Sequence, residues 1–177
     1  MAPDAGRSGS RPLAHLAAHG DRDAFVQIVA ENDADMFRLS VLITGDADLA
    51  RDAVQQAWSH AWQSLRSLRD ETRLRSWLLS IAANEARTLV RSERRLGARQ
   101  DAFAAALPTR PHIHEPNLEL EEALARLSPD DRAVLALRYL FGFNAREIAN
   151  HLHSTHGAIR SRLTRVLRVL RAELDDE

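Results

Sequence analysis

Apolar residues recur at intervals of three and four along most of the chain, the spacing that gathers side chains on one face of an α-helix. The clearest stripe is expected to face a core, and it comprises Val54, Ala57, Trp58, Ala61, Trp62 and Leu65. Alternation with period two, which is typical of half-buried strands, is absent from the sequence. The pattern therefore predicts an all-α protein.

The apolar stripes predict a group of helices in the first half of the chain, built around one core that contains the tryptophans. We expect a helix over about 21–32, a second from about Met36 to Gly45, a third capped by Asp46 or Asp48, and a fourth from about Arg73. Residues 66–73 lack this periodicity and predict a loop. This group should form one small helical domain.

Residues 96–117 differ from the flanking segments, because apolar periodicity fades and Pro108, Pro111 and Pro116 would break a helix. We expect a disordered N-terminal extension over 1–20, a helical domain over 21–95, a flexible linker over 96–117 and a second helical domain over 118–177. Fully extended, the linker could reach roughly 75 Å. That span covers about two turns of B-DNA.

The second domain carries the pattern of a helix-turn-helix at residues 144–165. Asn144, followed three residues later by Glu147, has the form of a capping box. After a break near His153 and Ser154, Thr155 can cap a second helix. That helix has an apolar face, and its charged residues as far as position 171 are all basic: Arg160, Arg162, Arg165, Arg168 and Arg171.

A helix of this kind suits the major groove of DNA, where arginines pair with guanine edges or phosphates. An ordinary amphipathic surface helix would show the same periodicity. The short capped helix directly before it favours the DNA-binding interpretation.

Composition adds few constraints. The net charge is only −1, so a binding site for a highly charged partner would show only as a local cluster of charged residues. There is no Cys, which excludes disulfides, thiol catalysis and Cys-ligated zinc. No apolar run approaches membrane-spanning length and the first residues lack an apolar signal core, so we expect a cytoplasmic protein without membrane insertion.

Two groups of residues have spacings compatible with metal binding: His112, His114 and Glu115, and His151, His153 and His156. The first group lies in the proline-rich segment without a rigid scaffold, and the second straddles the turn, where a tetrahedral site would be crowded. We expect no metal and no other cofactor. No nucleophile or glycine-rich pocket loop accompanies the acidic residues, so we expect no enzyme.

Several motifs, in order, resemble the extracytoplasmic-function (ECF) sigma factors of the bacterial sigma-70 family. The first is Ala50 to Trp58 followed by Trp62, and the second is Leu68 to Glu71 followed by Trp77-Leu78 and Ile81 to Asn84. The third is Leu127-Ser128-Pro129 with the Glu147-Ile-Ala and Gly157-Ala-Ile-Arg-Ser-Arg-Leu runs. Ser128 followed by Pro129 also predicts the start of a helix, with the serine as cap and the proline at the first helical position. The resemblance covers about residues 21–174 and implies two small helical domains, each of which binds promoter DNA.

The resemblance also implies roles for particular residues. Those expected to bind the clamp helices of the largest subunit of core RNA polymerase are Asp52, Gln55 and Gln56. Those expected at the −10 element are Leu68, Arg69, Asp70, Glu71, Asn84, Arg87, Thr88 and Arg91. Those expected at the −35 element are Thr155, His156, Arg160, Ser161, Thr164 and Arg165. An anti-sigma factor is a further possible partner.

The chain departs from the family pattern at several of these sites. Gln56 replaces an acid, Leu68 an aromatic residue, Asp70 a glycine, and His153 the glycine of the turn. Two alternatives stay open. One is a conventional helix-turn-helix regulator whose first domain is a sensor or dimer module, and the other is a sigma-like decoy, for which Gln56 is the relevant feature.

Overall fold

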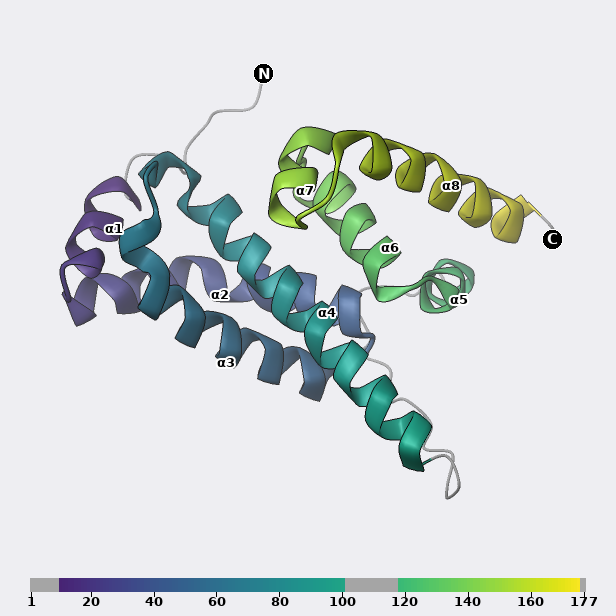
Figure 1. Ribbon diagram of the computed structural model, residues 1–177, viewed down its shortest axis with the longest axis horizontal. Coiled ribbons are helices and arrows are strands. Elements are labelled where there is room, and N and C mark those ends of the chain that lie inside the picture. Colours follow the sequence, from purple (N-terminus) through teal and green to yellow (C-terminus); the bar gives the residue numbers. More distant parts are fainter. Residues whose placement is uncertain (1–9, 101–117, 176–177) are drawn as a thin grey trace.

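We describe a computed structural model of the chain, which covers residues 10–100 and 118–175 (Figure 1). The longer helices are α1 (Ser10–Ala18), α2 (Arg22–Thr44), α3 (Ala47–Ser64), α4 (Leu74–Gln100), α5 (Leu118–Arg126), α6 (Pro129–Leu135), α7 (Ala145–His151) and α8 (His156–Asp175). Short 3₁₀ turns lie at Leu65–Ser67 and Glu71–Arg73, and a π-helical turn at Ala136–Leu140. The described residues contain no strand, so the predicted all-α fold of two helical domains is confirmed.

Helix α2 is one continuous helix, and the prediction of two separate helices over this stretch was wrong. Its buried face runs through Ile28, Asn32, Met36 and Leu39, and the Asn32 amide donates to the Ile28 carbonyl at 2.8 Å. The polar residues between Asn32 and Met36 looked like a break in the sequence. They include no glycine or proline, however, and the buried asparagine satisfies its own amide within the helix.

Two helix ends in this domain, at Gly45 and Asp46, are at predicted residues, and Asp21 caps the start of α2. Asp21 accepts a hydrogen bond from the Ala24 amide at 3.0 Å, and Gly45 ends α2 in the left-handed conformation with φ of 74°. Asp46 caps α3 by accepting from the amides of Asp48 and Leu49. Of the two cap candidates for α3, the structure selects Asp46.

The core of the first domain is built on alanine more than on tryptophan. The face that α3 buries comprises Ala50, Ala53, Val54, Ala57 and Ala61. Trp58 is only half-buried and Trp62 is 40% exposed, and both meet the Phe25 ring edge-on at centroid distances of 5.7 and 4.8 Å. Small side chains let α3 approach α2 and α4 closely, so the tryptophans lie at the margin of the core that they were expected to centre.

Two expected domain boundaries differ from the helix ends. Part of the extension expected to be disordered over 1–20 forms α1, whose Ala14 and Ala17 are buried in the core. The Arg66 side chain donates to the Ala18 carbonyl at 2.8 Å and fixes the end of α1. Helix α4 continues to Gln100, past the expected linker start at 96. Apolar contact explains why α1 is ordered, and residues 1–9 and 101–117 lie outside the described residues.

The second domain begins with α5 and turns into α6 at a cap that the sequence predicts. The Ser128 hydroxyl accepts from the Asp131 amide at 3.1 Å, and Pro129 occupies the first helical position. Gly142, with φ of 75°, ends the π-helical turn. A small apolar cluster inside this domain comprises Ala123, Leu127, Leu135, Val166 and Leu170.

The helix-turn-helix consists of α7 and α8. The predicted capping box is confirmed, because the Asn144 side chain accepts from the Glu147 amide while the Glu147 carboxylate accepts from the Asn144 amide at 2.8 Å. Thr155 caps α8 by accepting from the Ala158 amide at 3.2 Å. The two helices therefore begin where the sequence places them.

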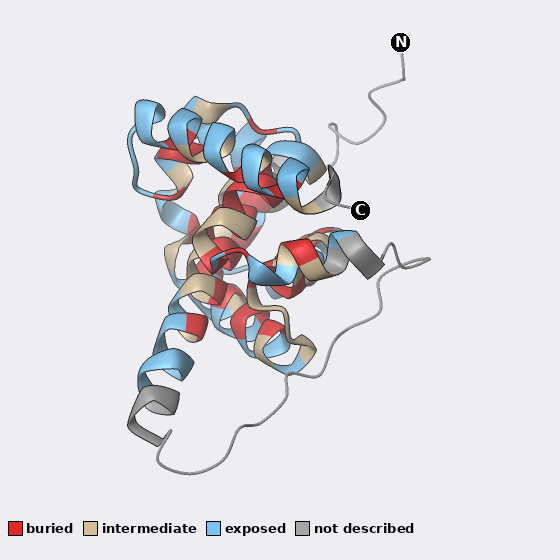
Figure 2. Cartoon of the chain, turned by 90° about the vertical axis from the view of Figure 1, so that its right-hand side faces the viewer, coloured by how far each residue is buried: buried red, intermediate tan, exposed pale blue. Residues whose placement is uncertain are grey.

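The two domains pack against each other. Helix α6 contacts α2 and α4, helix α7 contacts α4, and α8 packs on α5, α6 and α7 (Figure 1). One apolar cluster joins Val134, Leu137 and Ile148 of the second domain to the buried residues of α2, α3 and α4. In Figure 2, buried residues line both domains and the faces that they turn toward each other. The described residues thus form one body with a shared core.

The turn between α7 and α8 places a residue with a side chain where helices commonly have glycine. His153 has φ of 51°, and the Ser154 amide donates to the Ala149 carbonyl at 2.8 Å, the bond that defines a Schellman motif. A side chain in this left-handed conformation costs about 1 kcal/mol. The exposed imidazole makes no hydrogen bond within the described residues that would offset this cost.

We therefore expect His153→Gly to raise the free energy of unfolding by about 0.5 kcal/mol, the relief of strain less the entropy that glycine loses on folding. Denaturant unfolding followed by circular dichroism measures the change. His153→Ala is the matched control, because it keeps the Cβ and should give no gain. If the glycine and alanine variants changed the free energy of unfolding equally, the backbone at His153 would not be strained.

Candidate polymerase and nucleic-acid interfaces

The expected polymerase-binding residues lie on the surface of α3. Asp52, Gln55 and Gln56 are all exposed, and no ion pair within the described residues engages the Asp52 carboxylate. Asp52 and Gln55 are three residues apart and share one side of the helix. This side is opposite to the buried alanine face, so these polar groups are available to a partner.

Gln55 also borders a shallow groove of about 450 Å³ between α2 and α3. The groove is lined by Asp33, Phe37, Arg51, Val54, Gln55, Trp58 and Ser59. The Trp58 indole donates to the Asp33 carboxylate at 2.8 Å, and the Arg51 guanidinium lies 5.8 Å from the centre of the Phe37 ring. Sequence reasoning missed Asp33 and Phe37, whose spacing of four residues on α2 could have placed them on one face.

The loop between α3 and α4 is more ordered than the sequence suggests. The Asp70 carboxylate accepts from both the amide and the hydroxyl of Thr72, at 3.0 and 2.5 Å, and lies 3.4 Å from the Arg73 guanidinium. Asp70 therefore caps the turn at Glu71–Arg73. This local role explains how an acid can occupy a position where the related pattern has glycine.

A hollow of about 510 Å³ lies beside this loop, but its other wall is α1. The lining residues are Ala14, His15, Ala18, His19, Leu65, Arg66, Leu68 and Glu71. Leu68 and Glu71 line the hollow as expected of a loop pocket, whereas Asn84 and Arg87 do not. Arg69 and Thr88 are exposed. The loop residues and the α4 residues thus do not line the same hollow.

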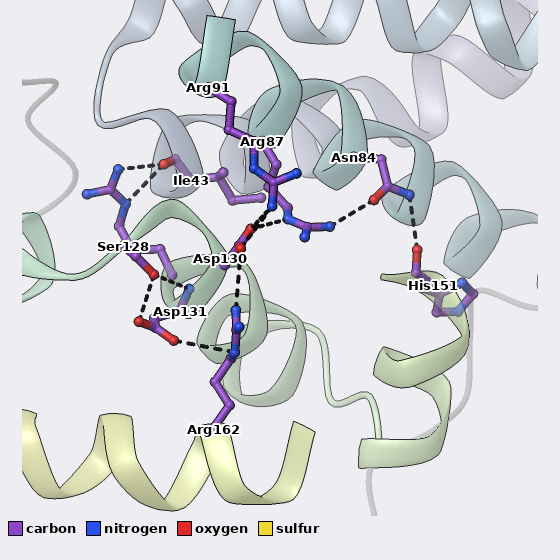
Figure 3. Close-up of polar contacts among 10 residues, drawn as sticks. Ile43, Asn84, Arg87, Arg91, Ser128, Asp130, Asp131, His151 and Arg162 are labelled. Atoms are coloured by element: carbon purple, nitrogen blue, oxygen red, sulfur yellow. Dashed lines mark hydrogen bonds and ion pairs between the residues drawn. The ribbon is translucent and has the colours of Figure 1, made fainter. Parts of the chain in front are cut away.

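The α4 residues are brought together on the face that meets the second domain (Figure 3). The Asn84 amide donates to the His151 carbonyl at 3.0 Å, and its oxygen accepts from Arg87 at 3.0 Å. Arg87 and Arg91 both bind the Asp130 carboxylate at the start of α6, at 2.6 and 2.9 Å. The polar stripe predicted from the sequence exists, but α6 and α7 cover Asn84 and Arg87, while Arg91 stays partly exposed.

Asp130 is held in its ionised form. Burial alone raises the pKa of its carboxyl, but hydrogen bonds and positive charge from Arg87, followed by Arg91, outweigh burial and bring the pKa below its ordinary value. Because the folded pKa is depressed, these ion pairs contribute above the ordinary pKa and are lost only as the pH falls through the lowered one. Asp130 therefore binds both arginines at neutral pH.

The expected −35 residues lie together on the outer surface of the helix-turn-helix. All of them are exposed: Thr155, His156, Arg160, Ser161, Thr164 and Arg165. The Thr164 hydroxyl donates to the Arg160 carbonyl at 3.1 Å, which leaves its methyl group available for contact. Arg165 bonds to the Asp131 carboxylate at 3.1 Å and is otherwise open to solvent.

Arg162 pairs with α6 and not with Glu147, which the sequence had suggested as its partner. Its guanidinium lies 3.6 Å from both Asp130 and Asp131, whereas Glu147 closes the capping box. Helix α6 packs directly under α8, so its acids reach Arg162 before any acid of α7 does.

His151 is the histidine of the turn region that is most enclosed. Burial lowers its pKa, and its ring lies 5.5 Å from the Phe143 ring, so it is neutral near pH 7. Within the described ranges no group of three or more His, Asp or Glu side chains could hold a metal ion. His112, His114 and Glu115 lie outside those ranges. None of the helices described is both long and apolar enough to cross a membrane.

Comparisons with known proteins agree with this arrangement. Residues 28–96 match the family model for sigma-70 region 2, and residues 117–170 match the model for sigma-70 region 4. The ECF RNA polymerase sigma factor SigL of Mycobacterium tuberculosis is 32% identical over 152 residues, which are 82% of this chain and 86% of SigL. The match to region 2 favours the sigma factor over a regulator with a sensor domain.

Solved structures give the same result. The sigma factor RpoE, in complex with the anti-sigma factor NepR from Bartonella quintana, is 25% identical with a TM-score of 0.72 and covers 86% of this chain and 98% of its own. CnrH, in complex with the cytosolic domain of CnrY, is 27% identical with a TM-score of 0.68 and covers 96% and 100%. The chain therefore belongs to the ECF sigma factors of the sigma-70 family, alternative sigma factors that act with RNA polymerase.

Proposed function

We propose that this sigma factor binds core RNA polymerase through α3, reads the −35 element with α8, and binds one strand of the −10 element along α4 as the promoter melts. The observation that carries the proposal is the presence of two arginine-bearing faces on different domains, on α4 and on α8. A regulator of duplex DNA needs only the second. The polymerase supplies the chemistry, so the chain needs no catalytic site of its own.

The polymerase contact would use the exposed side of α3 and the neighbouring groove. The exposed Asp52 can pair with arginines of the clamp helices, and a charge-assisted hydrogen bond of this kind orients a partner as well as binding it. Gln55 and the groove residue Phe37 add an amide and apolar area next to it. Gln56 supplies hydrogen bonds without charge.

The −10 contact would use the amide and arginines of α4 together with the loop. An asparagine amide has both donors and an acceptor, so Asn84 can read a base edge, while Arg87 and Arg91 follow the phosphates. Unstacking a base costs a few kcal/mol, and stacking and hydrogen bonds at the loop must offset this cost. Leu68 offers apolar area without an aromatic face, so the loop backbone and Glu71 would carry most of the selectivity.

We further propose a cytoplasmic location, where polymerase and promoters are found, and regulation by an anti-sigma factor. Support for the second point comes from RpoE and CnrH, the relatives solved with NepR and with the cytosolic domain of CnrY.

Run-off transcription on genomic promoter fragments, with purified chain and core polymerase, tests the proposed function. We expect promoter-specific transcripts only when both are present. Tight binding of one operator by the free chain, without any effect of core polymerase, would support the regulator instead. Core binding without transcripts from any fragment would support a decoy.

We expect Asp52→Ala combined with Gln55→Ala to weaken binding to core polymerase by about tenfold, since charge-assisted contacts contribute about 1.5–3 kcal/mol in such interfaces. Equilibrium binding to labelled core polymerase measures this, and circular dichroism checks that helicity is unchanged. Gln63→Ala, at another exposed position of the same helix, is the matched control. Unaltered affinity in the double variant would remove the contact from this surface.

We expect Arg160→Ala and Arg165→Ala each to cost about 1–3 kcal/mol and to relax the preference at one base pair of the −35 element. Both arginines project from the exposed side of α8, where bidentate pairing with guanine is possible. Transcription from a library randomised at each −35 position measures the effect. Arg168→Ala is the control, because a phosphate contact should weaken all sequences alike. If both variants only scale the output, α8 does not read these bases.

A further inference from the structure

The start of α6 carries two adjacent carboxylates that bind arginines of two other helices (Figure 3). Asp130 binds Arg87 and Arg91 of α4, at 2.6 and 2.9 Å. Asp131 binds Arg165 of α8 at 3.1 Å. Arg162 of α8 lies 3.6 Å from each carboxylate. Two acids of one helical turn therefore hold arginines from both faces that the proposed function assigns to promoter DNA.

A carboxylate on an arginine occupies the place that a DNA phosphate would take. The guanidinium presents its donors in a planar fork that pairs equally well with carboxylate and phosphate oxygens. Asn84 is engaged in the same way, because its amide donates to the His151 carbonyl and its oxygen accepts from Arg87. In this arrangement the Asn84 amide is engaged and the Arg87 guanidinium is covered, while the Arg91 side chain stays 52% exposed.

Other contacts between the domains fix the arrangement. The Arg132 guanidinium donates to the Ile43 carbonyl at 2.7 and 3.0 Å, at the carbonyl end of α2. Arg75 of α4 lies 5.4 Å from the centre of the Phe141 ring. The shared apolar cluster closes the rest of the contact. A nucleic-acid strand cannot reach Arg87, whose side chain is 13% exposed, unless α6 moves away from α4.

Separation of the domains does not require either of them to unfold. The second domain keeps its own cluster around Leu127 and Val166, and the first keeps the alanine-rich contacts among α2, α3 and α4. The ion pairs to α4 are only partly buried, and such pairs contribute little net free energy in water. Opening also exposes part of the shared apolar cluster, so a partner that binds the separated domains must offset that cost.

We propose that the free chain is autoinhibited by this contact: Asp130 occupies Arg87 and Arg91 of α4, and the chain must open before α4 can bind the −10 strand. The inference rests on the proposed function for the role of α4. The free chain should consequently bind nucleic acid weakly, and core polymerase should favour the open form by engaging the domains separately.

The test uses the variant Asp130→Asn, which keeps the shape of the side chain and removes its charge. The closed state then leaves Arg87 and Arg91 against a neutral amide, which favours opening. Asp23→Asn is the matched control, since Asp23 is exposed and occupies the same second position of a helix, α2. Both variants change the net charge equally, so a general effect of charge cancels in the comparison.

Opening is measured by energy transfer between fluorophores on the two domains. The chain has no Cys, so Gln63→Cys on α3 and Arg168→Cys on α8 give two specific labelling sites at exposed positions. We expect one high-transfer population in the unmodified background and in Asp23→Asn. Asp130→Asn should show a second, low-transfer population, and core polymerase should produce it in the unmodified background.

Binding of a fluorescent single-stranded oligonucleotide is measured on the same proteins without labels. We expect Asp130→Asn to bind about three- to tenfold more tightly than the unmodified chain and Asp23→Asn. Adding Arg87→Ala and Arg91→Ala to Asp130→Asn should abolish the gain, which assigns it to the released arginines.

An unchanged distribution of energy transfer in Asp130→Asn would overturn the proposed autoinhibition. Opening of the chain without any gain in strand binding would overturn it as well. Run-off transcription by the unmodified chain is read separately. If the chain transcribes promoters but Asp130→Asn leaves the energy-transfer distribution unchanged, the chain has the proposed function without the autoinhibition.

Discussion

The contact between α4 and α6 determines how the two functional surfaces of this sigma factor relate to each other. Helix α4 buries one face, which includes Leu78 and Ala82, against its own domain. Its other face carries Asn84, Arg87 and Arg91 and meets the start of α6. Because the stripe proposed to bind DNA lies on the opposite face of α4 from the core, the position of α6 decides whether that stripe is covered or open.

Local features of this chain could be predicted from the sequence because each depends on residues a few positions apart. The capping box at Asn144, the Ser128–Pro129 helix start and the αL end of α2 at Gly45 were all predicted correctly. Helix breaks were predicted less well, since polar residues near Asp33 suggested an interruption that α2 does not have. A polar stretch predicts a break only when it also removes backbone donors or needs an unusual φ.

The pairing of charges could not be predicted in the same way. Asp130 and Asp131 look in the sequence like acids that favour the start of α6, and they occupy that position. The ion pair with α4 depends on how the domains dock and the one with α8 on how the second domain folds, over separations of 43 residues to Arg87 and 34 to Arg165. The spacing of apolar residues indicates which face of a helix is buried, but it does not indicate which other helix covers that face.

The internal ion pairs also change how salt should act on promoter binding. A protein whose arginines are free releases one condensed counterion for each phosphate that it neutralises, so affinity falls steeply with salt. Here Arg87 and Arg91 exchange the Asp130 carboxylate for a phosphate when the closed form opens, whereas Arg162 and Arg165 pair with α6 of their own domain. Salt weakens the internal pairs as well as the contacts to DNA, and the two effects oppose each other. The net charge of −1 gives no sign of this exchange, because it sums the charged residues and does not depend on which of them are paired.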